Sequence, residues 1–332
     1  MSNNQVASII SKSTCKKKTY NILTFNTHER YQTQLAKTGH NFYAFNADGM
    51  KEWIPGHGDI PKNYYNLPKN SIYTGLDFDF ILAQSKFGQM QAAHQINQML
   101  NLPIVALEHT LPVQNWTNEQ LSQMKQMTGD VNVFISEYSA KQWGPTGSRE
   151  VVLHSIDTEL FKPQEGLERK PQVLSVVHNF IDRDYCCNYS GWQRITKPDG
   201  INTRVVGDTP GLSKQSDSIQ DLVSEYQSSQ IFLNTSTLSP IPMALLEAMA
   251  CGCAVVTTAT CMIPEIIEDG VNGYISNDED QLQSSIQNLL NNPSLAKELG
   301  ENARQTIIEK FNEDSFVGNW NNIFNKAYGL KK

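Results

Sequence analysis

The residues best suited to chemistry lie in one stretch, residues 239–252, where a loop leads into a short apolar segment that carries a single acid, Glu247. The loop predicts a helix that begins near Met243, and the first N–H groups of a helix have no partner within it. These N–H groups and the positive end of the helix dipole bind phosphate or another anion. A carboxylate further along the same helix can accept hydrogen bonds from two vicinal sugar hydroxyls. The stretch therefore predicts a site for a ligand that contains both phosphate and sugar.

Two prolines limit which backbone groups of this loop can take part. Residues 240 and 242 are proline and have no N–H to donate. The groups expected to contact phosphate and sugar are Ser239 and the backbone N–H groups of Ile241, Met243 and Ala244. The alternatives are an ordinary turn with two prolines and, for Glu247, a solvated helix acid.

Size and composition set the class of protein. A chain of 332 residues can form two domains, each with its own core. The net charge of −7 provides no overall basic field for nucleic acid or an anionic membrane. No apolar run approaches the roughly 20 residues of a membrane-spanning helix, and the first residues do not resemble a signal peptide. We therefore expect a cytoplasmic protein.

No metal site is expected. The six cysteines fit neither a Cys-x-x-Cys pair nor a disulfide framework. Asp77 and Asp79 form a bare Asp-x-Asp pattern, but they stand where a predicted strand begins, at the wrong end for a ligand. The sequence thus indicates chemistry that does not depend on a metal.

Apolar strands alternate with helices along the whole chain. The first half has predicted strands at 20–25, 41–45, 78–83, 103–107, 131–135 and 151–153, helices at 88–100 and 117–127, and a long loop over 47–70. The second half has predicted strands at 173–177, 203–206, 231–234 and 255–258, and helices at 217–226, 279–291 and 294–310. Continuous apolar strands of this kind are typical of parallel sheets covered by helices on both faces.

The pattern predicts two Rossmann-like domains, 1–155 and 156–310, whose parallel sheets face a central cleft. A C-terminal helix, 311–332, with aromatic residues at 320, 324 and 328 is expected to pack back toward the first domain. Ligands of such sheets bind beyond the carboxyl ends of the strands. The polar residues that follow predicted strands are Asn26, His28, Glu29, His109, Gly207 and Ser239.

The second half resembles glycosyltransferase family 4, retaining enzymes of the GT-B fold that use nucleotide sugars. The resemblance rests on four motifs: residues 152–163 (Val-Leu-His-Ser-Ile-Asp-Thr-Glu-Leu-Phe-Lys-Pro), residues 205–207 (Val-Val-Gly), residues 246–252 (Leu-Glu-Ala-Met-Ala-Cys-Gly), and the Pro-Glu-Ile-Ile that begins at Pro264 and is followed by Gly270 and Gly273. It covers about residues 150–275. The first half matches mainly in the order of its strands and in His109.

The resemblance implies roles for residues of the second half. Glu247 would bind ribose, Gly207 and Leu246 would belong to the donor site, and Arg183 would neutralise the diphosphate. Two positions depart from the family's pattern: Ser239 stands where an acid that contacts the donor sugar is usual, and Asn188 stands where a diphosphate lysine is usual.

Histidines and their neighbours in the first half are candidates to bind the hydroxyl group that reacts. A neutral imidazole at His109 can hydrogen-bond the transferred sugar or an acceptor hydroxyl; the alternative is a strand-end histidine with structural partners. Asn26, His28 and Glu29 follow the first strand, and we expect them to contact the acceptor.

These features predict a glycosyltransferase, a hexosyl- or pentosyltransferase, that uses a UDP- or GDP-type sugar as co-substrate and holds no permanent cofactor. The acceptor stays open among glycan, lipid, small molecule and modified DNA. The alternatives are a nucleotide-sugar epimerase or hydrolase on the same fold, a phage-type DNA glycosyltransferase, and a binding protein that has lost catalysis.

Overall fold

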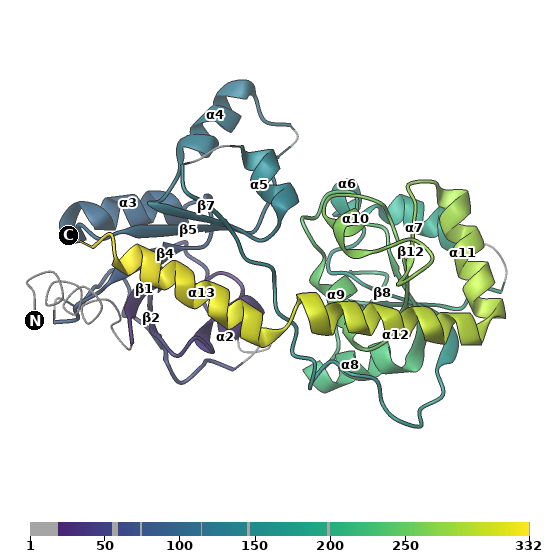
Figure 1. Ribbon diagram of the computed structural model, residues 1–332. Coiled ribbons are helices and arrows are strands. Elements are labelled where there is room, and N and C mark those ends of the chain that lie inside the picture. Colours follow the sequence, from purple (N-terminus) through teal and green to yellow (C-terminus); the bar gives the residue numbers. More distant parts are fainter. Residues whose placement is uncertain are drawn as a thin grey trace, which may run out of the picture. The chain divides into compact units, whose positions relative to one another are not determined.

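The computed structural model describes residues 19–54, 59–73, 75–113, 115–144, 147–197 and 200–331. The chain forms two compact units (Figure 1). Unit 1 runs to His154 and resumes at Asp314, and unit 2 is Ser155–Glu313. The first 18 residues of the predicted N-terminal domain lie outside the described residues.

Unit 1 is built on a parallel sheet in the strand order β3-β2-β1-β4-β5-β6-β7. Its strands are β1 (Asn21–Phe25), β2 (Asn41–Phe45), β3 (Tyr64–Asn66), β4 (Phe80–Ala83), β5 (Ile104–Glu108), β6 (Val131–Phe134) and β7 (Arg149–Val151). Its helices are α2 (Glu29–Ala36), α3 (Gln89–Leu100), α4 (Asn118–Gln126), α5 (Glu137–Trp143) and α13 (Glu313–Tyr328).

Both faces of this sheet are covered, which explains why its central strands β1, β4, β5 and β6 are almost continuously buried. Leu23 of β1 packs with Met90 and Ile96 of α3 on one face. The opposite face carries Phe80, whose ring stacks on Phe324 of α13 with centroids 5.3 Å apart. The yellow helix along these strands in Figure 1 is α13, the aromatic tail that the sequence predicts as a helix.

Unit 2 is built on a second parallel sheet, in the strand order β12-β11-β10-β8-β9. Its strands are β8 (Lys170–Val176), β9 (Thr203–Val206), β10 (Ser229–Asn234), β11 (Ala254–Thr257) and β12 (Tyr274–Ile275). Its helices are α6 (Asp184–Cys187), α7 (Tyr189–Thr196), α8 (Ile219–Ser228), α9 (Met243–Ala250), α10 (Ile263–Ile266), α11 (Glu279–Asn291) and α12 (Pro293–Lys310).

The predicted α/β class with parallel sheets is confirmed, and the corrections concern short elements. Residues 47–70, predicted as a loop, contain β3, and the sequence pattern also missed β12, α5, α6 and α7. Only Tyr64 of the three residues of β3 is buried, so the strand lacks an apolar pattern. Among the described residues, no helix has both the length and the apolar character needed to cross a bilayer.

Two glycines allow α12 to lie against the turn that follows α9. A Cβ at Gly300 would lie 2.2 Å from the carbonyl oxygen of Gly252, closer than any Cβ can approach. Gly252 itself has a φ of 76°, the left-handed conformation in which helices commonly end. Close contact between α12 and α9 therefore requires a glycine at position 300.

We predict that Gly300→Ala lowers the free energy of unfolding by about 1–3 kcal/mol, because the new methyl group must push α12 away from the Gly252 turn. Gly318→Ala is the matched control: this helical glycine in α13 is exposed, and its Cβ would meet no atom within 4 Å. Alanine should stabilise there by about 0.5–1 kcal/mol. Urea unfolding measures both, and equal stability of the two variants would contradict this packing.

Candidate functional site

The carboxyl ends of the strands in unit 2 carry loops that hydrogen-bond to one another. After β8 and β9, the N–H of Asn179 donates to the carbonyl of Asp208 at 2.7 Å, and the N–H of Asp208 donates to Nδ1 of His178 at 3.0 Å. The N–H of Phe180 donates to the Thr209 hydroxyl at 3.0 Å. These bonds fix the backbone where ligands of a parallel sheet bind.

The loop between β10 and α9 is held from both sides. The N–H groups of Thr237 and Leu238 both donate to the carbonyl of Cys186 in α6, at 2.9 and 3.2 Å. The carbonyl of Ser236 accepts from the hydroxyls of Thr258 and Thr260 beyond β11. The predicted phosphate loop therefore enters α9 along a defined path.

Helix α9 has an open N-terminus and a closed C-terminus. Met243 and Ala244 are half-buried, and no described residue accepts a hydrogen bond from either N–H group. At the other end, Arg169 donates to the carbonyl of Cys251 and Arg304 to that of Ala250. Cations near the carbonyl end stabilise a helix, and α9 has two of them there. The positive, N-terminal end of its dipole has no comparable partner among the described residues.

Two predicted donor-site residues, Gly207 and Leu246, have structural roles in unit 2. The N–H of Gly207 donates to the carbonyl of Lys214 at 3.1 Å, and a Cβ there would lie 2.0 Å from the carbonyl oxygen of Val177. Gly207 thus lets the end of β9 pass close to the end of β8. Leu246 is fully buried in α9, so its side chain belongs to the core.

Arg183 and Ser239 lie on the loops of this carboxyl edge. Arg183 precedes α6 and is exposed, and its guanidinium donates to the carbonyl of His178 at 3.5 Å. Ser239 is half-buried and lies two residues before Ile241, whose side chain is buried. The guanidinium of Arg183 is therefore accessible to solvent.

Glu247 lies in the second turn of α9 and is 2% exposed. Its carboxylate accepts a hydrogen bond of 2.9 Å from the hydroxyl of Tyr226 in α8. Tyr226 is itself fully buried and packs against Phe161 and Phe232. The carboxylate is therefore part of the interior of unit 2, a placement that the sequence pattern did not indicate.

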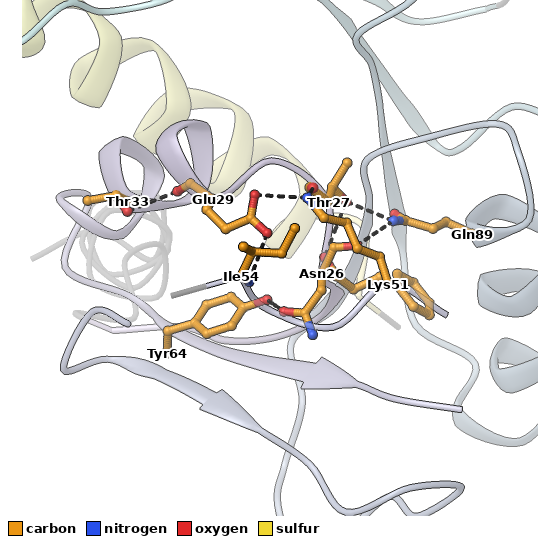
Figure 2. Close-up of polar contacts among 9 residues, drawn as sticks. Asn26, Thr27, Glu29, Thr33, Lys51, Ile54, Tyr64 and Gln89 are labelled. Carbon is orange, nitrogen blue, oxygen red and sulfur yellow. Dashed lines mark hydrogen bonds and ion pairs between the residues drawn. The ribbon is translucent and has the colours of Figure 1, made fainter. Parts of the chain in front are cut away.

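In unit 1, two of the predicted acceptor residues belong to a polar network at the ends of β1 and β3 (Figure 2). The Asn26 amide accepts from the Tyr64 hydroxyl at 2.6 Å. The Glu29 carboxylate accepts from Nζ of Lys51 at 2.8 Å and from the N–H of Ile54 at 3.1 Å. Glu29 therefore fastens residues 51–54 to the start of α2.

Three histidines and one tyrosine of unit 1 form a group of neighbouring rings. The Tyr31 ring lies edge-to-face against His109 and His154, with centroids 4.6 and 5.3 Å away, and its hydroxyl accepts from Nε1 of Trp320 at 3.0 Å. The His28 ring lies edge-to-face against His109 at 4.9 Å. His109 and His154 are buried, and His28 is exposed.

Burial keeps these imidazoles neutral. It lowers the pKa of His109 well below its usual value, and nearby His28 and His154 lower it further. Burial also lowers the pKa of His154 to about 4. The pKa of His28 is lowered by the surrounding protein and by the positive charge of Lys51. The buried Nε2 of His109 has no hydrogen-bond partner among the described residues.

Sequence reasoning singled out His28 and His109 but not His154 or Tyr31. His154 follows β7 as His109 follows β5, so the rule that selects polar residues after strands would have found it. The described residues contain no group of three or more His, Cys, Asp or Glu side chains placed to hold a metal ion. Asp79 instead accepts a hydrogen bond from the N–H of Asn21 and pairs with Lys331.

Comparison with known proteins defines the class. Residues 213–306 match the family model "Glycosyl transferases group 1". The structure is similar to sucrose-phosphate synthase from Thermosynechococcus elongatus (TM-score 0.73, 13% identity, 94% of this chain and 100% of that one). It is also similar to HepE from Anabaena in complex with UDP (TM-score 0.74, 14% identity, 93% of this chain and 100% of that one). The chain has the GT-B fold, and residues 213–306 of unit 2 are similar to group 1 glycosyl transferases.

Curated relatives match over shorter stretches. N-acetyl-alpha-D-glucosaminyl L-malate synthase of Bacillus anthracis is 24% identical over 186 residues, 55% of this chain and 47% of that protein. Poly(ribitol-phosphate) alpha-N-acetylglucosaminyltransferase of Staphylococcus aureus is 33% identical over 99 residues, 29% of this chain and 20% of that protein. The chain thus spans less than half the length of these relatives. The predicted GT-B fold is confirmed, and these matches support a relationship to glycosyltransferases.

The buried His154 predicts how stability depends on pH. Its folded pKa of about 4 lies below the usual 6.5, so below pH 6.5 the unfolded chain takes up a proton that the folded chain refuses. We expect unit 1 to lose about 2–3 kcal/mol of stability from this group as the pH falls from 6.5 toward 4. Amide exchange of β1 and β5 at pH 7.5 and 4.5 measures that loss.

His154→Asn should reduce the acid-induced loss by about that amount, because asparagine takes up no proton. His94→Asn, a change at an exposed histidine of α3, is the control and should leave the loss as in the wild type. An equal loss in His154→Asn and the wild type would contradict the role of His154.

Proposed function

We propose that this protein transfers a sugar from a nucleoside diphosphate to an acceptor hydroxyl, with retention at the anomeric carbon. The observation that carries the proposal is the open N-terminus of α9 at the carboxyl edge of the sheet in unit 2. Arginines bind the carbonyls at the C-terminal end of α9, and the positive N-terminal end of the helix favours an anion. A diphosphate has the charge and size for that position.

The donor is proposed to bind along the loops of unit 2. The N–H groups of Met243 and Ala244 bind the diphosphate, and the loop residues Ser239 and Ile241 face the sugar. Gly207 lets the neighbouring loop approach. The guanidinium of Arg183 neutralises the diphosphate as it leaves. A uridine donor is favoured because HepE, a structural neighbour, is known in complex with UDP and with UDP-glucose.

Glu247 is proposed as the ribose ligand through an exchange of partners. Its carboxylate bonds the Tyr226 hydroxyl, and a ribose hydroxyl is a donor of the same kind. Binding would replace or supplement the tyrosine bond, and the buried position would strengthen the new one. Tyr226 then keeps the carboxylate hydrogen-bonded while the ribose is away.

The acceptor is proposed to react on the side of unit 1, at His109 and His28. Neutral imidazoles can both donate to and accept from a hydroxyl group. In a retaining transfer of this kind, a donor phosphate oxygen takes the acceptor proton, and the protein supplies positioning and stabilises the charge. Arg183 and the backbone N–H groups of α9 then provide most of the stabilisation of the negative charge on the leaving diphosphate.

We predict that Arg183→Gln weakens UDP binding about tenfold or more, because one charge-assisted contact to the diphosphate is lost. Arg204→Gln is the matched control in the same unit, since Arg204 is ion-paired with Glu225 at 2.6 Å on the surface. Titration calorimetry with UDP, together with UDP release from UDP-sugars, measures both variants. A wild type that binds no nucleotide diphosphate, or two variants that bind UDP equally well, would overturn the proposal.

A further inference from the structure

The three histidines around Tyr31 form a polar site with no net charge of its own. We name His28, His109 and His154 the histidine cluster. The His109 ring contacts those of His28, His154 and Tyr31, and the His154 ring also contacts Tyr31, with centroids between 4.6 and 6.3 Å apart. No carboxylate raises the pKa of His109 or His154, and burial lowers both. At neutral pH the cluster therefore offers hydrogen-bond donors and acceptors without a positive charge.

Glu29 cancels the nearby features that would attract an anion. Lys51 is the cation whose charge reaches His28, and its Nζ pairs with the Glu29 carboxylate at 2.8 Å while also donating to the Thr27 carbonyl. Helix α2 begins just after His28, so its positive end points to the same place, and Glu29 stands in its first turn. One buried carboxylate thus offsets both the lysine and the helix dipole.

One nitrogen of the cluster lacks a protein partner. Nε2 of His109 is buried without a hydrogen bond among the described residues, which costs about 1–3 kcal/mol when nothing else satisfies it. An imidazole nitrogen in this position bonds readily to a hydroxyl group, which can serve as donor or acceptor to suit the tautomer. The geometry suits a hydroxyl better than a carboxylate, which can only accept.

We propose that the histidine cluster binds the acceptor of the transfer reaction and selects an uncharged, hydroxyl-rich molecule over a phosphorylated or carboxylated one. The inference rests on the proposed function and adds the chemical class of the acceptor. A phosphate at this site would be desolvated among neutral rings, and Lys51 is already paired. A neutral polyol exchanges its bonds to water for bonds to imidazoles without that penalty.

His28 is the member of the cluster that a ligand reaches first. It is exposed, whereas His109 and His154 are buried. Its ring lies edge-to-face against that of His109, with centroids 4.9 Å apart, so a ligand bound at His28 lies next to the buried imidazole. The buried pair then sets the position of the hydroxyl, held by Tyr31 and Trp320 behind it.

Matched acceptors that differ only by a phosphate test the proposal. The pairs are glycerol with glycerol 1-phosphate, ribitol with ribitol 5-phosphate, and glucose with glucose 6-phosphate. With UDP-sugar as donor, we expect kcat/KM for each neutral member to exceed that of its phosphorylated partner by about tenfold or more at pH 7.5. In parallel, the imidazole NMR signals of His28 and His109 should shift with the neutral member and not with its partner.

His28→Arg should reverse the preference, because it places a permanent cation at the cluster. His94→Arg adds the same charge on α3, where His94 is exposed, and should leave the preference unchanged. Glu29→Gln, which frees Lys51 from its partner, should also raise the use of phosphorylated acceptors. These variants separate a local charge effect from a change in total charge.

The two readouts distinguish failure of this inference from failure of the proposed function. Product from phosphorylated acceptors at equal or greater efficiency overturns the inference alone. Histidine shifts with neutral ligands but no transfer from any nucleotide sugar would support the inference and overturn the transferase proposal. If neither member of any pair shifts the histidine signals, the cluster is no acceptor site.

Discussion

The polarity of helix α9 is the constraint on which this account of the protein depends. Arg169 and Arg304 hold its last carbonyls, and the first N–H groups, at Met243 and Ala244, face no acceptor among the described residues. Hydrogen bonds hold the loop before α9 to α6 and to the segment after β11. The loop is therefore fixed in a position in which its own groups do not cap the first N–H groups of α9. A fixed, positive helix end of this kind binds phosphate and other anions, which is the basis for the proposed diphosphate site.

The two units handle charge in opposite ways. In unit 2 the exposed Arg183 and the positive end of α9 are the groups proposed to bind a nucleotide diphosphate. In unit 1 Glu29 removes the positive potential of α2 and Lys51, and burial keeps His109 and His154 neutral. This contrast fits a reaction in which one substrate is strongly anionic and the other is chosen for its hydroxyl groups.

The sequence was sufficient for the features that depend on local pattern. Continuous apolar strands predicted parallel sheets, and the aromatic spacing of residues 320–328 predicted α13. Contacts between distant residues could not be predicted this way. Glu29 was expected to contact the acceptor, and nothing in its sequence position indicated its two partners, which are 22 and 25 residues away. Glu247 likewise matched a family motif that gives no hint of its bond to Tyr226. Short elements such as β3 escaped because three residues carry too little periodicity.

The most direct test of the central claim is amide hydrogen exchange at single-residue resolution, with and without UDP. This account predicts that UDP slows exchange at Met243 and Ala244, with smaller effects in residues 179–183, and leaves the amides of unit 1 strands unchanged. Slower exchange confined to other parts of unit 2, or no change at Met243 and Ala244 at saturating UDP, would contradict it.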